Sequence, residues 1–197
     1  MNKRKLKTEH IDKKHNPMNT IKYIILGILT LAFTSSYSQT TDAPKTEFTK
    51  MYLPVWLEAR KHCLQVAETM PADKYHWKPS PDSKTFGEQM VHIAHTIELL
   101  TQRYVLGMEV TANTPNANNM SKAEIIKLLE TGFDYVTSVI MTVENEKLSE
   151  TCKMYHSGNI VSREFAFFYV QDHLTNHRAK ANLYIRMNGI APPEYTW

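Results

Sequence analysis

The chain of 197 residues is long enough for one domain with additional segments, and its 42% of hydrophobic residues suffices for a core. Only six glycines and few β-branched runs favour helices over sheets. The whole chain has 23 lysine or arginine residues and 20 acidic residues, and residues 1–38 contain seven and two of these, respectively. Residues 39–197 therefore have 16 basic and 18 acidic residues. A remainder with a net charge of −2 gives no electrostatic reason to expect nucleic acid as a partner.

The start of the chain has the form of a secretory signal peptide. After a polar stretch, Lys22 precedes an apolar run at residues 23–33, which is shorter than the roughly 20 residues of a membrane-spanning helix. Ser36 and Ser38 are small residues of the kind that precede a cleavage point, here between Ser38 and Gln39. We therefore expect a protein that is exported to the periplasm or secreted, with no stable membrane anchor after cleavage.

This interpretation divides the chain into three parts. We expect an N-terminal extension with a secretory signal peptide at 1–38, a linker at 39–47 and one helical domain at 48–197. Two alternatives stay open: an uncleaved membrane anchor in place of the signal peptide, and translation from Met18 rather than Met1.

Four segments carry the pattern of amphipathic helices. They span residues 48–70, 85–107, 121–143 and 162–189, and capping boxes formed by Thr85 with Glu88 and by Ser121 with Glu124 begin the second and third. In the second segment, apolar residues recur in steps of four and three from Phe86 to Tyr104, as in a helix that faces a core. Four such helices with mostly short links predict an all-α fold, an up-down four-helix bundle.

The helical spacing also predicts the core. We expect it to include Trp56, Ile93, Ile97, Leu129, Phe133 and Val170. In the first segment we expect Trp56, Leu57, Leu64 and Ala67 to form the apolar side. The two cysteines, Cys63 and Cys152, are expected to be free thiols, although export makes a disulfide chemically permissible.

Two histidines occupy the middle of the apolar side of the fourth segment. His173 and His177 stand four residues apart, so both rings leave the same face of the helix. That spacing suits two ligands of one metal ion, and burying an unpartnered imidazole costs about 1–3 kcal/mol. Packed core histidines or surface histidines remain alternatives. A third ligand would come from the second segment, where periodicity does not decide between His92 and His95.

Two stretches of the sequence resemble the DinB/YfiT-like family of four-helix-bundle proteins. They read MPADKYHWKPSPDSKTFGEQMVHIAH at residues 70–95 and QDHLTNHRAKANLYIRMNGIAPPEY at residues 171–195. The resemblance covers nearly all of residues 48–197, which it implies to be a DinB-like four-helix-bundle domain. The family phrase E-x-x-x-H-I-A falls on Glu88 and His92.

A second family phrase, H-x-x-x-H-R, falls on His173, His177 and Arg178. The resemblance therefore implies three metal ligands, His92, His173 and His177, and it places the third ligand at His92 rather than at the histidine three residues later. The family often continues with Gly-Gln after the arginine, whereas Ala-Lys stands at residues 179–180 here. This departure leaves the implied ligands intact.

Three neutral histidines that leave one coordination position open are the pattern of a catalytic rather than a structural metal site. A divalent ion such as zinc, nickel or iron would accept three nitrogens, and the sequence does not choose among them. Glu88, one turn before His92, is the candidate catalytic base or the acceptor for an imidazole N–H. We therefore predict a divalent-metal-dependent hydrolase or transferase that acts on an unidentified small molecule. A non-catalytic metal- or ligand-binding helical bundle is the alternative.

Characterised relatives of the family include metal-dependent transferases that add a low-molecular-weight thiol to an electrophile, whereas many others have no known reaction. The expected export argues against thiol transfer here, since reduced thiol cofactors are mainly cytosolic. Asp172 and Arg178, which flank the predicted ligands, are expected to be solvated or to form structural ion pairs. Assembly as a homodimer stays open.

Overall fold

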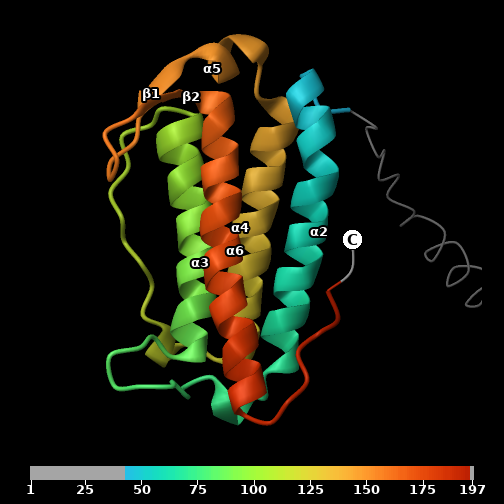
Figure 1. The fold of residues 1–197 in the computed structure, drawn as a ribbon, viewed down its shortest axis with the longest axis vertical. Helices are drawn as coiled ribbons and strands as arrows, with labels where there is room; N and C mark the ends of the chain where they lie inside the picture. Colours follow the sequence, from blue (N-terminus) through green and yellow to red (C-terminus); the bar gives the residue numbers. More distant parts are fainter. Residues whose placement is uncertain (1–42, 196–197) are drawn as a thin grey trace, which may run out of the picture. The chain divides into compact units, whose positions relative to one another are not determined.

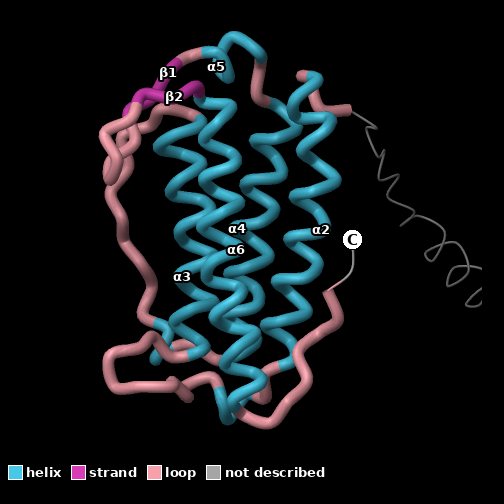
Figure 2. Tube along the Cα trace, viewed as in Figure 1, coloured by secondary structure: helices cyan, strands magenta, loops and turns pink. Residues whose placement is uncertain are grey.

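The computed structural model describes residues 43–195. The predicted signal peptide and residues 39–42 of the predicted linker lie outside this range. Within it, four long helices lie side by side as a bundle, as Figures 1 and 2 show. They are α2 (Glu47–Thr69), α3 (Phe86–Leu100), α4 (Lys122–Thr142) and α6 (Arg163–Met187). The predicted all-α four-helix bundle is therefore confirmed.

One connection departs from a simple up-down order. Gly87 lies against Ile125, and Gly132 lies against Ala94, so residue numbers rise together along α3 and α4 and the two helices are parallel. Figure 1 shows the chain leaving the top of α3 and descending along the outside of the bundle before α4 begins at the bottom. The loop at residues 107–121, fully extended, reaches about 50 Å, which exceeds the length of about 30 Å of a helix such as α4. The predicted up-down order would make α3 and α4 antiparallel, whereas this long crossover makes them parallel.

Gly132 sets the distance between the two parallel helices. A Cβ atom added there would lie 2.7 Å from the carbonyl oxygen of Ala94 in α3, which is closer than real Cβ contacts. Glycine at this position therefore allows α4 to approach α3 two residues from His92. The packing of α4 thus supports the part of α3 that carries the predicted ligand.

Predicted capping residues begin the helices. The Thr85 hydroxyl accepts a hydrogen bond from the Glu88 nitrogen at 3.1 Å, and Oε2 of Glu88 accepts one from the Thr85 nitrogen at 2.7 Å. Ser121 and Glu124 form the same reciprocal pair at the start of α4. The Ser162 side chain caps α6 by accepting from the backbone nitrogen three residues later. Both capping boxes and the start of the last helix are therefore confirmed.

The predicted core is buried, but one residue of the predicted apolar side of α2 is exposed. The residues expected from spacing are all fully enclosed: Trp56, Ile93, Ile97, Leu129, Phe133 and Val170. Leu57, which was predicted on the apolar side of the first segment, is 44% exposed, so that assignment was wrong. Leu57 directly follows Trp56, and at 3.6 residues per turn consecutive residues point about 100° apart, so only one of them faces the core. Leu64 is half-buried, and Cys63 and Cys152 are free thiols.

The segment between α4 and α6 contains more regular structure than the sequence indicated. A short helix, α5 (Asn145–Ser149), precedes strand β1 (Thr151–Lys153), which pairs antiparallel with β2 (Ile160–Ser162). Figure 2 shows this hairpin at the end of the bundle where α6 begins. Among residues 43–195, no helix combines the length and the hydropathy of a membrane-spanning segment.

The far end of α3 continues into a π-helical turn at Thr101–Val105. The turn is followed by Gly107, which has a φ of +73° and where a Cβ atom would lie 2.5 Å from an Arg163 nitrogen. Within the turn, Tyr104 is buried and its ring centroid lies 5.8 Å from that of Tyr169 in α6. The π turn therefore joins α3 to α6 close to the hairpin.

Candidate metal centre

Ring side chains recur along α6 at intervals of four residues, with each ring turned about 40° from the one before: Phe165, Tyr169, His173 and His177. Four residues are slightly more than one helical turn, so these rings form a continuous stripe along the helix. His177 is buried and His173 is half-buried. The stripe leads from the hairpin end of the bundle to the predicted histidine pair.

His92 of α3 lies opposite this pair. Its Nε2 atom is 3.2 Å from Nε2 of His173, and its ring centroid is 4.3 Å from that of His177. One nitrogen from each of the three rings lies within 4.8 Å of the other two. The structure thus brings together the three histidines that the resemblance implied as ligands.

His95, the other candidate in α3, lies outside this group of three. It is half-buried, and its Nε2 is enclosed without a hydrogen-bond partner among residues 43–195. Its nitrogens do not converge with those of His173 and His177. The tertiary structure therefore distinguishes His92 from His95 where periodicity did not.

Three convergent imidazole nitrogens suit a divalent cation, and one pair of them already has the expected spacing. With zinc–nitrogen bonds of about 2.0–2.1 Å at tetrahedral angles, two imidazole nitrogens lie about 3.3 Å apart. The separation of 3.2 Å between the Nε2 atoms of His92 and His173 is close to that value. Imidazole is also a suitable ligand for nickel and iron, so the three histidines do not identify which metal binds.

Their surroundings hold these imidazoles in the neutral form. Burial lowers the pKa of His177 to about 3 and that of His92 to about 4, and the neighbouring rings and the charges of Lys84 and Lys180 act in the same direction. Burial also lowers the pKa of His173, again with a contribution from Lys180. Because the rings are neutral at pH 7, each keeps a nitrogen lone pair for a cation.

Gln89 orients one of the rings. Its Oε1 atom is 2.7 Å from Nδ1 of His177, and since a carbonyl oxygen only accepts, Nδ1 carries the hydrogen and Nε2 keeps the lone pair. The Gln89 amide in turn donates to the Tyr184 hydroxyl at 3.4 Å. Outer partners of this kind fix the tautomer and raise the basicity of a ligand. Sequence reasoning missed Gln89, although its position three residues before His92 places both on one face of α3.

Glu88 caps the start of α3 and also lies beside His92. Its Oε2 atom is engaged in the capping box with Thr85. Glu88 and His92 also line one pocket of about 220 Å³, which the loop at residues 114–117 closes on the other side. The hydrogen-bond acceptor found for a ligand ring is Gln89, whereas the role of Glu88 as a base remains a prediction.

The two charged residues beside the helix-α6 histidines differ from each other. Asp172 is exposed, as expected. Arg178 is buried, its Nη1 donates to the carbonyl oxygen of Ala59 in α2 at 3.4 Å, and its guanidinium lies 6.0 Å from the centroid of the Tyr195 ring. The expectation that Arg178 is solvated or ion-paired was wrong, because the arginine ties α6 to a backbone carbonyl of α2.

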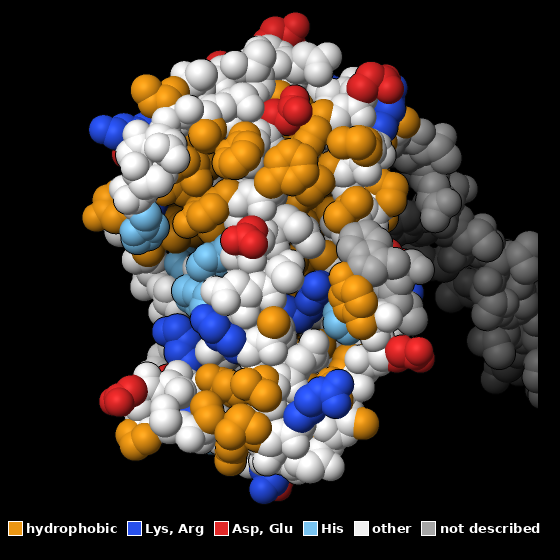
Figure 3. Space-filling model, viewed as in Figure 1, with side chains coloured by type: hydrophobic (Ala, Val, Ile, Leu, Met, Phe, Trp, Pro, Cys, Tyr) orange, Lys and Arg blue, Asp and Glu red, His pale blue; other side chains and the backbone are white. Residues whose placement is uncertain are grey.

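The surface around the histidines carries different kinds of side chain on its two sides. On the face drawn in Figure 3, histidine side chains form a patch with hydrophobic side chains above it and lysine or arginine side chains below it. Lys180 follows His177 by three residues, so the two share a face of α6, and Lys84 lines the pocket that includes His92. Both lysines are exposed.

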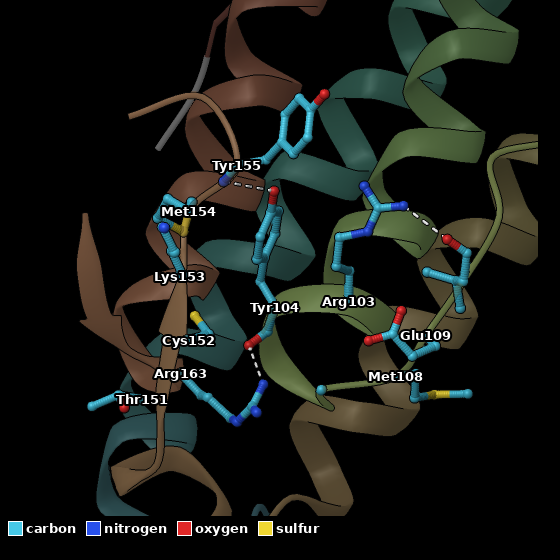
Figure 4. A pocket seen from close by; sticks show the side chains of 12 residues that line it. Arg103, Tyr104, Met108, Glu109, Thr151, Cys152, Lys153, Met154, Tyr155 and Arg163 are labelled. Atoms are coloured by element: carbon cyan, nitrogen blue, oxygen red, sulfur yellow. Dashed lines mark hydrogen bonds between the residues drawn. The ribbon is translucent and has the colours of Figure 1, made fainter. Parts of the chain in front are cut away.

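A second cavity, of about 760 Å³, lies between the π turn of α3 and the hairpin and contains none of the three histidines. Its arginines bind backbone carbonyls: Arg103 donates to Val110 at 2.8 Å and Arg163 to Tyr104 at 3.0 Å, as Figure 4 shows. Burial raises the pKa of Cys152 in the same cavity, which keeps it a protonated thiol at neutral pH. This cavity is larger than the pocket at the histidines, but both of its arginines are bound by the protein itself.

Comparison with known proteins agrees with the resemblance seen in the sequence. The DinB superfamily profile matches residues 56–181, which include all three histidines. A DinB-like protein from Bacillus subtilis has a similar structure, with a TM-score of 0.59 and 19% identity over 74% of this chain and 96% of that one. For a DinB-like protein from Bacillus cereus the TM-score is 0.62, with 14% identity over 74% of this chain and 95% of that one.

These identities are low enough that the structural likeness shows the fold alone. No curated protein matches the sequence significantly. The superfamily match spans most of the described bundle, and the two solved structures share its architecture. This chain belongs to the DinB superfamily.

Proposed function

We propose that this protein is a divalent-metal-dependent hydrolase or transferase with His92, His173 and His177 as its metal ligands. The observation that carries the proposal is the convergence of one nitrogen from each ring within 4.8 Å. A structural zinc site has four protein ligands, whereas this group, within residues 43–195, has three. One coordination position is thereby left for a water molecule or a substrate.

The burial of the ligands indicates the side of approach. His92 and His173 are half-buried, whereas His177 is buried. A small molecule would therefore reach the site past the two half-buried rings. A divalent ion bound there would supply Lewis acidity, which polarises a carbonyl or phosphoryl oxygen and lowers the pKa of a water molecule.

The protein's own residues would orient the ligands and stabilise charge. Gln89 holds the tautomer of His177 that directs Nε2 toward the other rings. The positive charges of Lys84 and Lys180 act on the ligand rings. Positive charge beside the site favours a reacting group that becomes negative in the transition state, as in acyl transfer.

Glu88 is the proposed general base, because it lines the same pocket as His92 and Lys84. A carboxylate at this place would accept a proton from an attacking water or thiol. Glu88→Gln should lower turnover while leaving metal affinity nearly unchanged. Glu124→Gln is the matched control, because Glu124 has the same capping role at the start of α4. Equal loss of turnover in both variants would assign Glu88 to capping alone.

The experiment uses protein purified without a histidine tag and loaded with zinc, nickel or iron. Panels of esters, amides and electrophiles with a low-molecular-weight thiol are screened for turnover. Turnover that is lost in His173→Ala and kept in His76→Ala, a variant of an exposed loop histidine, supports the proposal. Metal binding without turnover on any panel would favour a non-catalytic metal-binding bundle, and absence of metal binding would reject both.

We also propose that the protein is exported and that residues 1–38 are removed. The support is the order of a basic residue, a short apolar run and small residues before Gln39. Mass spectrometry of the mature protein should find an N-terminus at or near Gln39. Cytosolic protein that begins at Met1 or Met18 would contradict this and would restore thiol transfer as the first reaction to test.

A further inference from the structure

We infer that the substrate carries an aromatic or short alkyl group, which binds in an apolar pocket between the hairpin and α6 while the reacting group lies at the three histidines. The inference rests on the proposed function, since it names the class of molecule on which that site acts. The pocket measures about 220 Å³. Its walls include Met154, Tyr155 and Val161 from the hairpin segment and Phe165 and Tyr169 from α6.

The pocket lies next to the histidine site along α6, because Tyr169, which lines the pocket, also contacts His173. Phe165 and Tyr169 line the pocket, and His173 and His177 follow them at the same interval of four residues. Each interval advances about 6 Å along the helix. The ring centroids of Tyr169 and His173 lie 6.4 Å apart. A molecule a few bonds long can therefore place one end in the pocket and the other beside His173.

The walls of the pocket are anchored to the bundle. The backbone nitrogen of Tyr155 donates to the Tyr104 hydroxyl at 3.3 Å. The ring of Tyr104 in turn packs against Tyr169, with centroids 5.8 Å apart. The π turn of α3 thus holds both walls, hairpin and helix, so the pocket exists before a ligand binds.

The size and lining of the pocket indicate its occupant. An apolar cavity of about 150 Å³ in another protein accommodates benzene, and pockets for drug-sized molecules measure about 300–1,000 Å³. A pocket of about 220 Å³ therefore suits one aromatic ring or a short alkyl chain rather than a larger molecule. Its rim carries exposed apolar surface, because Tyr155 is 79% exposed and Phe165 is 51% exposed. A bound apolar group would cover that surface.

The test measures carboxylates of increasing apolar size on the zinc-loaded full chain by titration calorimetry. The carboxylate group of each compound would bind at the histidine site. Acetate, butyrate, hexanoate and phenylacetate differ in the apolar group that would enter the pocket. We expect hexanoate and phenylacetate to bind at least about tenfold more tightly than acetate, since each buried methylene adds affinity. Equal affinity across the series would overturn the inference.

Matched variants locate the effect. Phe165→Ala and Tyr155→Ala should reduce the preference for hexanoate over acetate about fivefold or more, and Tyr155→Ala keeps its backbone hydrogen bond to Tyr104. Leu183→Ala is the control, because Leu183 is an apolar residue of α6 with a similar exposed fraction, 54% against 51% for Phe165, and lies outside the pocket. An equal loss in Leu183→Ala would overturn the assignment of the pocket.

Zinc titration of every variant separates the two proposals. Normal zinc affinity with no dependence on chain length would reject the pocket and leave the metal site standing. Absence of zinc binding in the wild type would reject both. Sedimentation at several protein concentrations tests whether a second copy of the chain occupies the pocket instead. Self-association that disappears in Phe165→Ala, together with equal affinity for all four carboxylates, would show that a second copy covers this face. That result would overturn the inference.

Discussion

The histidine cluster and the cavity beside the hairpin differ in what their polar groups contact. In the cavity of about 760 Å³, Arg103 and Arg163 donate to backbone carbonyls and Arg163 also pairs with Glu150, so the protein itself binds both arginines. In the histidine cluster, the nitrogens of three neutral rings converge on one another. Groups that are satisfied within the chain support the fold, whereas convergent lone pairs suit an external cation. Convergence therefore identifies the candidate site better than cavity size does.

The largest expected effect comes from removing a ligand. His173→Ala should lower zinc and nickel affinity by more than about 100-fold, because loss of an outer partner alone typically costs about 10–100-fold. Cys152→Ala, in the other cavity, should leave metal affinity unchanged. Titration calorimetry measures both, and unchanged affinity in His173→Ala would remove the site.

A related pair of variants tests the choice of ligand in α3. His92→Ala should lose metal affinity as strongly as His173→Ala, and His95→Ala should lose much less, because only His92 has a nitrogen in the convergent group. The opposite outcome, retention in His92→Ala and loss in His95→Ala, would keep a metal site but show that its geometry differs from that described here.

Gln89 should have the next largest effect. Gln89→Leu removes the acceptor for Nδ1 of His177, and we expect about 10–100-fold weaker metal binding, as for other outer partners. Gln89→Glu keeps an acceptor and should retain most of the affinity. If both variants bind metal equally well, the hydrogen bond to His177 does not orient a ligand.

Removal of the metal should lower stability through mass action. An ion present at about 100 times its Kd stabilises the native state by about 2.7 kcal/mol, which corresponds to a Tm shift of about 5–10 °C for a domain of this size. Differential scanning fluorimetry with and without a chelator should show this shift in the wild type and not in His173→Ala. A chelator effect of equal size in both proteins would point to an ion bound elsewhere.

Arg163 tests whether the cavity beside the hairpin supports the fold rather than the metal site. Arg163→Met removes the hydrogen bond to the carbonyl of Tyr104 and the ion pair with Glu150, and it should lower the free energy of unfolding by about 1–3 kcal/mol. Because this arginine supports the fold rather than the site, zinc affinity should stay within about twofold of the wild type. Urea denaturation and calorimetry measure the two quantities. A large loss of zinc affinity would mean that the cavity and the histidines act as one site.

The smallest expected effect is a pH dependence of the metal-free protein. The pKa values of His92 and His177 are lowered in the folded state to about 4 and about 3, below the ordinary value of 6.5. The unfolded chain therefore binds protons first, so the stability that these neutral rings contribute is present above pH 6.5 and is lost as the pH falls toward 4. Urea midpoints between pH 7 and pH 5 should fall more steeply in the wild type than in His92→Gln. Equal slopes would show that the two rings titrate normally.

Local patterns made much of the fold predictable. The capping boxes at Thr85 and Ser121 involve residues only three apart, and the burial of Ile93 and Phe133 follows from helical spacing. The interval between His173 and His177 likewise placed both rings on one face of α6. His92 was singled out by the family resemblance, because helical periodicity within α3 leaves it equivalent to His95.

Local patterns in the chain predict which segments are helices, where they begin and which rings lie on the same side, because those properties depend on residues within about one turn of each other. How helices distant in the chain meet becomes visible only in the folded bundle. The parallel arrangement of α3 and α4, the contact of Arg178 with α2 and the hydrogen bond from His177 to Gln89 all join residues far apart in sequence. Such contacts depend on the packing of one helix against another, and no pattern within a single helix specifies it.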